Sequence, residues 1–193
     1  MIVRTVLAVS LALALCALAF PAVEDARTTR TERAVDGELG GLSRAMHAVT
    51  ADDPVAVDER GARRSVTVTV PSPSATSARV TFVAIGGVPT RDRPPDAEER
   101  LPADARGDAR SVDAHGSADA RGDVLAYRVA GGRTHVERVP FDVRVAAEKE
   151  GDGWQVRSDD DPLVVRSPGR IRLLLRFVTY RGTPTVLVAE ARR

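Results

Sequence analysis

The sequence predicts an α+β protein, in which an N-terminal transmembrane helix continues into an amphipathic helix and a small antiparallel β-sheet or sandwich domain follows. Three observations support this prediction: an uncharged apolar segment near the start, an apolar stripe at helical spacing after it, and many short alternating segments in the rest. The expected division is residues 1–22 for the anchor, 23–50 for the amphipathic helix, 51–86 and 124–193 for the β domain, and 87–123 for a disordered insertion.

The apolar segment begins close to the N-terminus and carries no charged residue between Thr5 and Phe20. Residues 2–22, taken as one helix, extend about 31 Å, which matches a bilayer hydrocarbon core of about 30 Å. Arg4 lies near the end, where its side chain can reach the lipid headgroups. We therefore expect contact with membrane lipid through residues 2–22, a single-pass protein in the cell membrane, and a β domain outside the cytoplasm.

A cleaved signal peptide is the alternative reading of the same segment. Arg4 would form its basic start, and the small residues of Ala17-Leu18-Ala19 would precede a cleavage site before Phe20. The apolar run is longer than a usual signal sequence and Pro21 follows closely, so a retained anchor is favoured. The sequence leaves both readings open.

The amphipathic helix is predicted from apolar residues that recur at alternating spacings of four and three. They are Val35, Leu39, Leu42, Met46 and Val49. Asp52-Asp53-Pro54 should end the helix, because the residue before a proline avoids helical angles. The stripe either packs on the following β domain or binds a protein partner, and it covers too few heptads to predict a coiled coil. We expect His47 to be a surface residue.

The β domain is predicted from short segments that are β-branched or alternate between polar and apolar residues. Gly131-Gly132 is expected to form a two-residue hairpin turn. On the long strand at 170–180, Arg170, Arg172 and Arg176 share one face, which we expect to be solvated. The expected strands are 65–70, 79–85, 123–129, 134–139, 141–145, 154–157, 163–166, 170–180 and 185–189.

The insertion is rich in Asp, Arg, Ala, Gly and Pro, and it lacks any alternating apolar window. Such a composition cannot bury enough apolar surface to order itself, so disorder is expected. His115 lies within it. The acidic run that begins at Asp159 fits no EF-hand spacing and is read as a turn.

Composition and motif content argue against several classes of function. The chain has 193 residues, with 28 Lys+Arg against 27 Asp+Glu, and this balance argues against nucleic-acid binding through bulk positive charge. Cys16 is the single cysteine, so the sequence offers no internal disulfide and no cysteine-cluster zinc site. No nucleophile elbow, phosphate-binding glycine loop or zinc motif is present. We therefore assign no catalytic, cofactor-binding or metal-binding residues, and expect a protein that is not an enzyme.

Two resemblances add to this reading. LAFPAVEDA at residues 18–26 is similar to the end of the membrane helix in type IV pilins and pseudopilins, where an apolar run gives way at a proline to an amphipathic helix that packs on a β-sheet. The start MIVRTVLAVSLALAL, the strand GARRSVTVTVP and the closing LVVRSPGRIRLLLRF and TPTVLVAEARR resemble an uncharacterised haloarchaeal single-pass membrane protein family with a domain of unknown function. Lys149 is the only lysine among the basic residues, which agrees with such an origin.

These resemblances imply a membrane-anchored, pilin-like or accessory subunit of a pilus or secretion-type complex. Its protein partners would contact the stripe of Val35, Leu39, Leu42, Met46 and Val49, as well as the sheet. The alternative is a secreted β-rich binding module whose signal peptide has been removed.

Overall fold

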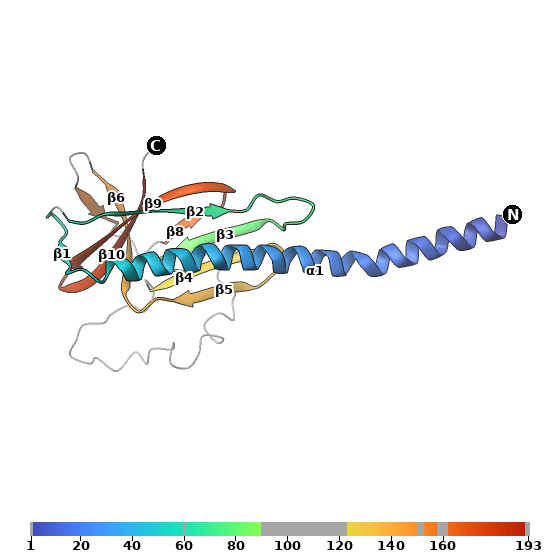
Figure 1. Ribbon diagram of the computed structural model, residues 1–193, viewed down its shortest axis with the longest axis horizontal. Coiled ribbons are helices and arrows are strands. Elements are labelled where there is room, and N and C mark those ends of the chain that lie inside the picture. The colour runs from blue at the N-terminus through green and yellow to red at the C-terminus, as the bar shows by residue number, and fades with distance from the viewer. Residues whose placement is uncertain (1, 60, 90–122, 150–152, 158–161, 192–193) are drawn as a thin grey trace.

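A computed structural model describes residues 2–59, 61–89, 123–149, 153–157 and 162–191 of the chain (Figure 1). One long helix, α1 (Ile2–Val49), leads into two β-sheets. Figure 1 shows the C-terminal half of α1 lying along the strands, whereas its N-terminal half extends beyond them. This arrangement confirms the predicted α+β class.

Helix α1 is continuous through Pro21, which lies inside it. A proline in a helix removes one backbone donor, and membrane-type apolar helices tolerate this better than water-exposed ones. The last turn closes with a hydrogen bond from the Thr50 amide to the Met46 carbonyl at 3.1 Å. The helix therefore ends just before Asp52-Asp53-Pro54, as predicted.

The first sheet has the strand order β1-β9-β10-β6-β7, and β2 also pairs with β9. Two of its pairings are parallel, β1 with β9 and β6 with β10, so the sheet is mixed rather than purely antiparallel. Its strands are β1 (Val55–Ala56), β2 (Arg64–Val70), β6 (Asp142–Glu148), β7 (Trp154–Val156), β9 (Gly169–Tyr180) and β10 (Thr183–Glu190).

The second sheet is antiparallel throughout, with the order β5-β4-β3-β8. Its strands are β3 (Val80–Ile85), β4 (Val124–Val129), β5 (Thr134–Arg138) and β8 (Leu163–Val165). At one end of the β3–β4 pair, the amides of Gly86 and Gly87 donate to the Val124 carbonyl at 2.9 and 3.2 Å. The chain therefore leaves the sheet and re-enters it at the same place. The expected insertion, residues 87–123, lies almost wholly outside the described residues, and so does His115 within it. Of its first residues, which the structure does describe, 87 and 89 are buried.

The two sheets and the second half of α1 share one apolar core. It joins side chains of the helix, such as Leu39, to Leu175 of the first sheet and Ile85 of the second. A smaller cluster on the other face of the first sheet holds Trp154, which is 5% exposed. Trp154 is therefore a core residue in an edge strand.

The hairpin turns differ in part from the prediction. Gly131 has φ 80° and the Gly132 amide donates to the Val129 carbonyl at 3.0 Å, so glycine occupies the third position of a turn that needs positive φ there. The β4–β5 connection, residues 130–133, is thus longer than two residues. The tight two-residue turn lies instead at Arg181-Gly182, where both residues have positive φ as in a type I′ hairpin.

The outer face of β9 is the second correction. Arg170 and Arg172 are exposed as expected, but Arg176 is only 2% exposed, and its Nη1 donates to the Val57 carbonyl at 3.3 Å. The segment around β1 runs along this end of β9 and covers the guanidinium. Alternation identified the correct face, but the covering segment could not be foreseen from the local pattern.

Candidate functional site

The interface between α1 and the two sheets, which we call the seam, has an apolar centre and polar side chains around it that hold the helix in place. Its centre is the apolar stripe, in which Val35 and Leu39 are 2% exposed, Leu42 and Met46 are fully buried, and Val49 is 7% exposed. The stripe packs on the β domain, which was one of its two expected roles. These five side chains are thus engaged within the chain.

The first polar contact of the seam lies at the end nearest the apolar half of α1. The guanidinium of Arg27 donates to the carbonyl of Ser74 at 2.7 Å and also reaches the Ser77 carbonyl at 3.4 Å. Both acceptors belong to the β2–β3 connection. One turn further along, the Thr31 hydroxyl accepts the Ala78 amide at 2.8 Å and donates to the Arg27 carbonyl at 2.9 Å. Thr31 is 1% exposed, so this buried hydroxyl satisfies a backbone donor that water cannot reach.

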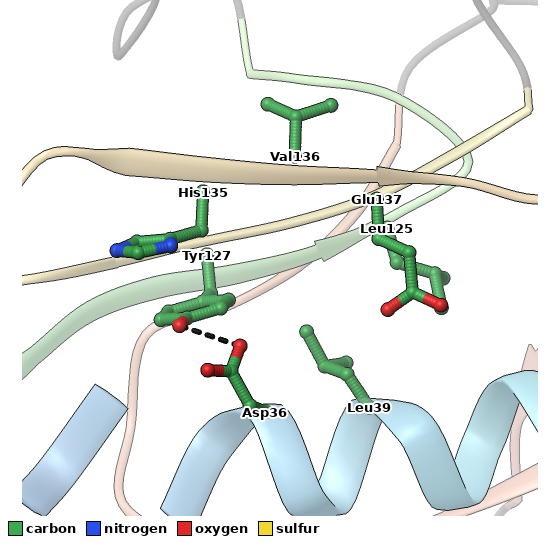
Figure 2. A pocket seen from close by; sticks show the side chains of 7 residues that line it. All are labelled: Asp36, Leu39, Leu125, Tyr127, His135, Val136 and Glu137. Atoms are coloured by element: carbon green, nitrogen blue, oxygen red, sulfur yellow. Dashed lines mark hydrogen bonds between the residues drawn. The ribbon is translucent and has the colours of Figure 1, made fainter. Parts of the chain in front are cut away.

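The second polar contact involves two aromatic rings of the β4–β5 hairpin (Figure 2). Tyr127 on β4 and His135 on β5 stack with their ring centroids 4.7 Å apart and their planes 5° from parallel. The Tyr127 hydroxyl donates to Asp36 Oδ1 at 2.6 Å, and His135 Nε2 lies 3.2 Å from Glu32 Oε1. Two carboxylates on successive turns of α1 thus hold one face of the hairpin.

A small hollow of about 130 Å³ opens between these groups. Figure 2 shows Val136 pointing away from the helix, whereas Tyr127 points toward Asp36. Burial, and then the hydrogen bond and negative charge of Asp36, raise the pKa of Tyr127 above its ordinary value of 10.0. The phenol therefore stays protonated and acts as a hydrogen-bond donor rather than as a base. The hollow is lined by Asp36, Leu39, Leu125, Tyr127, His135, Val136 and Glu137.

A second polar cluster lies where the chain re-enters the second sheet. Asp142 accepts hydrogen bonds from Arg144 Nε at 2.9 Å and from the Thr185 hydroxyl at 2.7 Å. Burial and the neighbouring charge of Asp142 raise the pKa of Asp123 from 3.8 to about 6, against the opposing influence of Arg144. Two donors therefore stabilise the Asp142 carboxylate. The nearby Asp123 carboxyl is harder to ionise, because its negative charge would be partly buried and close to that of Asp142.

The structure places the residues that the sequence analysis discussed as follows. Among the described residues, α1 is the one helix long and apolar enough to cross a membrane. The large apolar side chains of its N-terminal half are 53% (Val9) to 77% (Val3) exposed. The described part of the chain brings no three His, Cys, Asp or Glu side chains together as a metal site. The acidic run at 159–161 lies outside that part. His47 is exposed and meets Phe141 edge-on, with centroids 5.2 Å apart.

Comparison with known proteins gives a family. Residues 2–191 match the family described as Domain of unknown function (DUF7311). The chain belongs to this family. No curated protein and no solved structure matches it. The match spans the apolar helix as well as both sheets, so the family unit includes the helix together with the domain that packs on it.

Sequence reasoning did not find the Tyr127, His135 and Asp36 constellation. Alternation places Tyr127 and His135 on strands of one hairpin, which brings them into register opposite each other. Asp36 lies one position after the buried Val35, so it flanks the stripe. These two signals could have suggested a contact, but Asp36 and Tyr127 are 91 positions apart in the sequence, so no local pattern shows the pairing.

Proposed function

We propose that this chain is a non-enzymatic, single-pass membrane protein that works as a pilin-like or accessory subunit of a pilus or secretion-type complex. The observation that carries the proposal is the single continuous helix α1. Its apolar N-terminal window is 0% buried within the chain, while its second half is held by the β domain.

The exposed apolar side chains need a non-aqueous environment. Leu7, Leu11 and Leu13 are 68%, 59% and 66% exposed, and each contributes to membrane insertion. Soluble monomers rarely expose contiguous apolar surface on this scale. Lipid supplies that environment for an isolated subunit, and the apolar helices of neighbouring subunits would supply it in an assembly. We place the partner contacts on this exposed half of the helix, because the stripe of Val35 and its neighbours is occupied.

The seam supports a mechanical rather than a chemical role. Several of its polar groups bond to each other and to backbone groups, as the Tyr127–Asp36 and Thr31–Ala78 contacts illustrate. Because the helix is bonded to the sheets at several levels, we expect it to move together with them. Such coupling would pass a displacement of the membrane helix directly to the β domain.

The haloarchaeal resemblance and the pilin-like order of helix, proline, helix and sheet favour the same assignment. The β domain is proposed to lie outside the cytoplasm. The competing proposal is a secreted β-rich binding module, in which residues before Phe20 are removed as a signal peptide.

The test is to isolate the protein from its own host and to measure its intact mass and N-terminal sequence. A chain that retains residues 2–22 in the membrane fraction, and that crosslinks to pilus or secretion components, supports the proposal. A chain that starts near Phe20 and appears in the medium supports the secreted module instead. An anchored chain that crosslinks to no such component contradicts the pilin-like role and leaves the anchor.

A matched variant sharpens this test. Leu11→Arg places a charge at the centre of the apolar half, where a charged side chain disfavours insertion by about 3 kcal/mol. Arg33→Gln changes an exposed charge on the second half of the same helix. The proposal predicts that Leu11→Arg loses both membrane retention and crosslinks, whereas Arg33→Gln keeps both.

A further inference from the structure

The end of the β domain nearest the apolar half of α1 consists of two connections. These are residues 71–79 between β2 and β3 and residues 130–133 between β4 and β5, and we call them together the membrane-proximal rim. Figure 1 shows both reaching along α1 toward its N-terminal half. Arg27 fixes the level of the first connection through its hydrogen bonds to the carbonyls of Ser74 and Ser77.

The second connection lies at the same level of the helix. A Cβ atom added to Gly132 would meet Glu32 Oε1 at 2.7 Å and Thr28 Cγ2 at 3.4 Å, so this turn packs directly on the helix there. The two connections are therefore held beside residues 27–32 of α1, and they cannot slide along it without breaking these contacts.

Helix geometry gives the distance from this level to the membrane. If the hydrocarbon core ends at Ala22, Arg27 lies about 8 Å beyond it, at about 1.5 Å per residue. The headgroup layer on each side of a bilayer is about 5–8 Å thick. The contacts of the rim with residues 27–32 therefore lie about 8–15 Å beyond the hydrocarbon core, from the outer edge of the headgroups to about 7 Å outside them. The end of the helix at Val49 is about 33 Å further from the bilayer than Arg27.

The charge of the rim suits an anionic surface. Arg79 and Arg133 lie in the two connections, Arg128 lies two residues before the second one, and all three are exposed. Residues 71–79 and 128–133 contain no acidic residue. On the helix at this level, Glu24 is bonded to Arg27, and exposed Asp25 is offset by exposed Arg30. The carboxylate of Glu32 faces His135, with Oε1 3.2 Å from Nε2. Basic residues near a membrane surface are attracted by anionic lipid headgroups.

We propose that the membrane-proximal rim docks on the anionic headgroups of the bilayer that holds α1, so that the β domain stands on the membrane surface. This inference rests on the proposed membrane anchor. Docking at the rim sets the height of the β domain and restricts the tilt of the helix that carries it.

The experiment uses the full chain in lipid nanodiscs. A fluorophore is attached at Ala75→Cys or Ala130→Cys in the rim, or at Asp52→Cys at the far end of α1, each with Cys16→Ala. Quenching by a lipid with a headgroup quencher is compared between anionic phosphatidylglycerol and neutral phosphatidylcholine. We expect strong quenching at 75 and 130 in anionic discs, a loss of quenching in neutral discs or at high salt, and none at 52 in either.

Variants then test the arginines. Arg79→Gln with Arg133→Gln should reduce the quenching at 130 toward the value at 52, whereas Arg44→Gln, an exposed change further along α1, should leave it unchanged. Equal quenching at 75, 130 and 52, or rim quenching that ignores lipid charge and these variants, would overturn the docking.

The native cysteine separates this outcome from failure of the anchor. In the unlabelled chain, Cys16 should be protected from a membrane-impermeant maleimide when α1 is inserted. Protected Cys16 with an unquenched rim overturns the docking and leaves the anchor intact. Reactive Cys16 in the nanodisc preparation would overturn both proposals.

Discussion

The Tyr127 hydroxyl and the Asp36 carboxylate lie 2.6 Å apart and join strand β4 to helix α1 across the edge of the shared core. Asp36 follows Val35, which is buried in that core, so the polar bond and the apolar contact are made by adjacent residues of the helix. Strand β4 thereby holds the helix through the bond as well as through packing. The same helix carries the apolar half that we propose to enter the membrane.

Tyr127→Phe should destabilise the protein by about 1–2 kcal/mol, because it removes a hydrogen bond to a charged acceptor and keeps the ring that stacks on His135. Urea unfolding of the full chain in detergent micelles measures the change. Tyr180→Phe, in the first sheet, is the matched control and should change stability by less than about 0.5 kcal/mol. Equal losses in the two variants would contradict a specific role for the Tyr127 bond.

Thr31→Val should be more costly than its small change in shape suggests. Valine has nearly the same volume, but it leaves the buried Ala78 amide without the acceptor that lies 2.8 Å away. A buried donor without a partner costs about 1–3 kcal/mol. Thr31→Ser keeps the hydroxyl, so it should retain most of the stability in the same urea experiment. If valine were tolerated better than serine, packing rather than the hydrogen bond would dominate at this position.

The sequence predicted the elements whose signals are local. The stripe from Val35 to Val49 repeats with the helical period, and segments such as β2 alternate over their whole length, so their type and position agree with the structure. The two-residue strand β1 was missed, because Val55–Ala56 is too short to show any period. The parallel pairing of β6 with β10 was also missed, since it depends on how distant segments meet.

The candidate site was harder to predict from the sequence than the fold. Arg176 belongs to a face that alternation marks as outer, and only the segment carrying Val57 makes it buried. The Tyr127–Asp36 bond likewise joins residues far apart in the chain. A local pattern states which face a side chain occupies, but it does not state what another segment places against that face.

Gly37→Ala should stabilise the protein by about 0.5–1 kcal/mol. A Cβ atom at Gly37 meets no heavy atom within 4 Å, and alanine restricts the unfolded chain and favours the helix. Gly131→Ala is the opposite-sign control, because Gly131 has φ 80° in the β4–β5 connection, where a side chain is strained. Thermal unfolding of the two variants measures both effects. A destabilised Gly37→Ala variant would show that the exposed helix face is less open than the isolated chain indicates.

Asp123→Asn tests the acidic cluster through its pH dependence. The pKa of Asp123 is raised from 3.8 to about 6 by burial and by the charge of Asp142. Between these values the folded protein holds a proton that the unfolded chain has released. This carboxyl's contribution to stability is therefore full below about pH 4, decreases as the pH rises to about 6, and stays lost above that.

Asparagine at position 123 is neutral at every pH, so the free energy of unfolding of the variant should not show this decrease between about pH 4 and 6. Because the carboxyl is still partly solvated, we expect Asp123→Asn to be more stable than the native chain by about 1 kcal/mol at pH 7 and nearly equal to it at pH 4. Urea unfolding at a series of pH values measures the difference. Asp142→Asn should act in the opposite direction at pH 7, since it weakens the acceptor of the Arg144 and Thr185 hydrogen bonds. A stability difference between native chain and Asp123→Asn that does not change with pH would show that the carboxyl titrates alike in the folded and unfolded states.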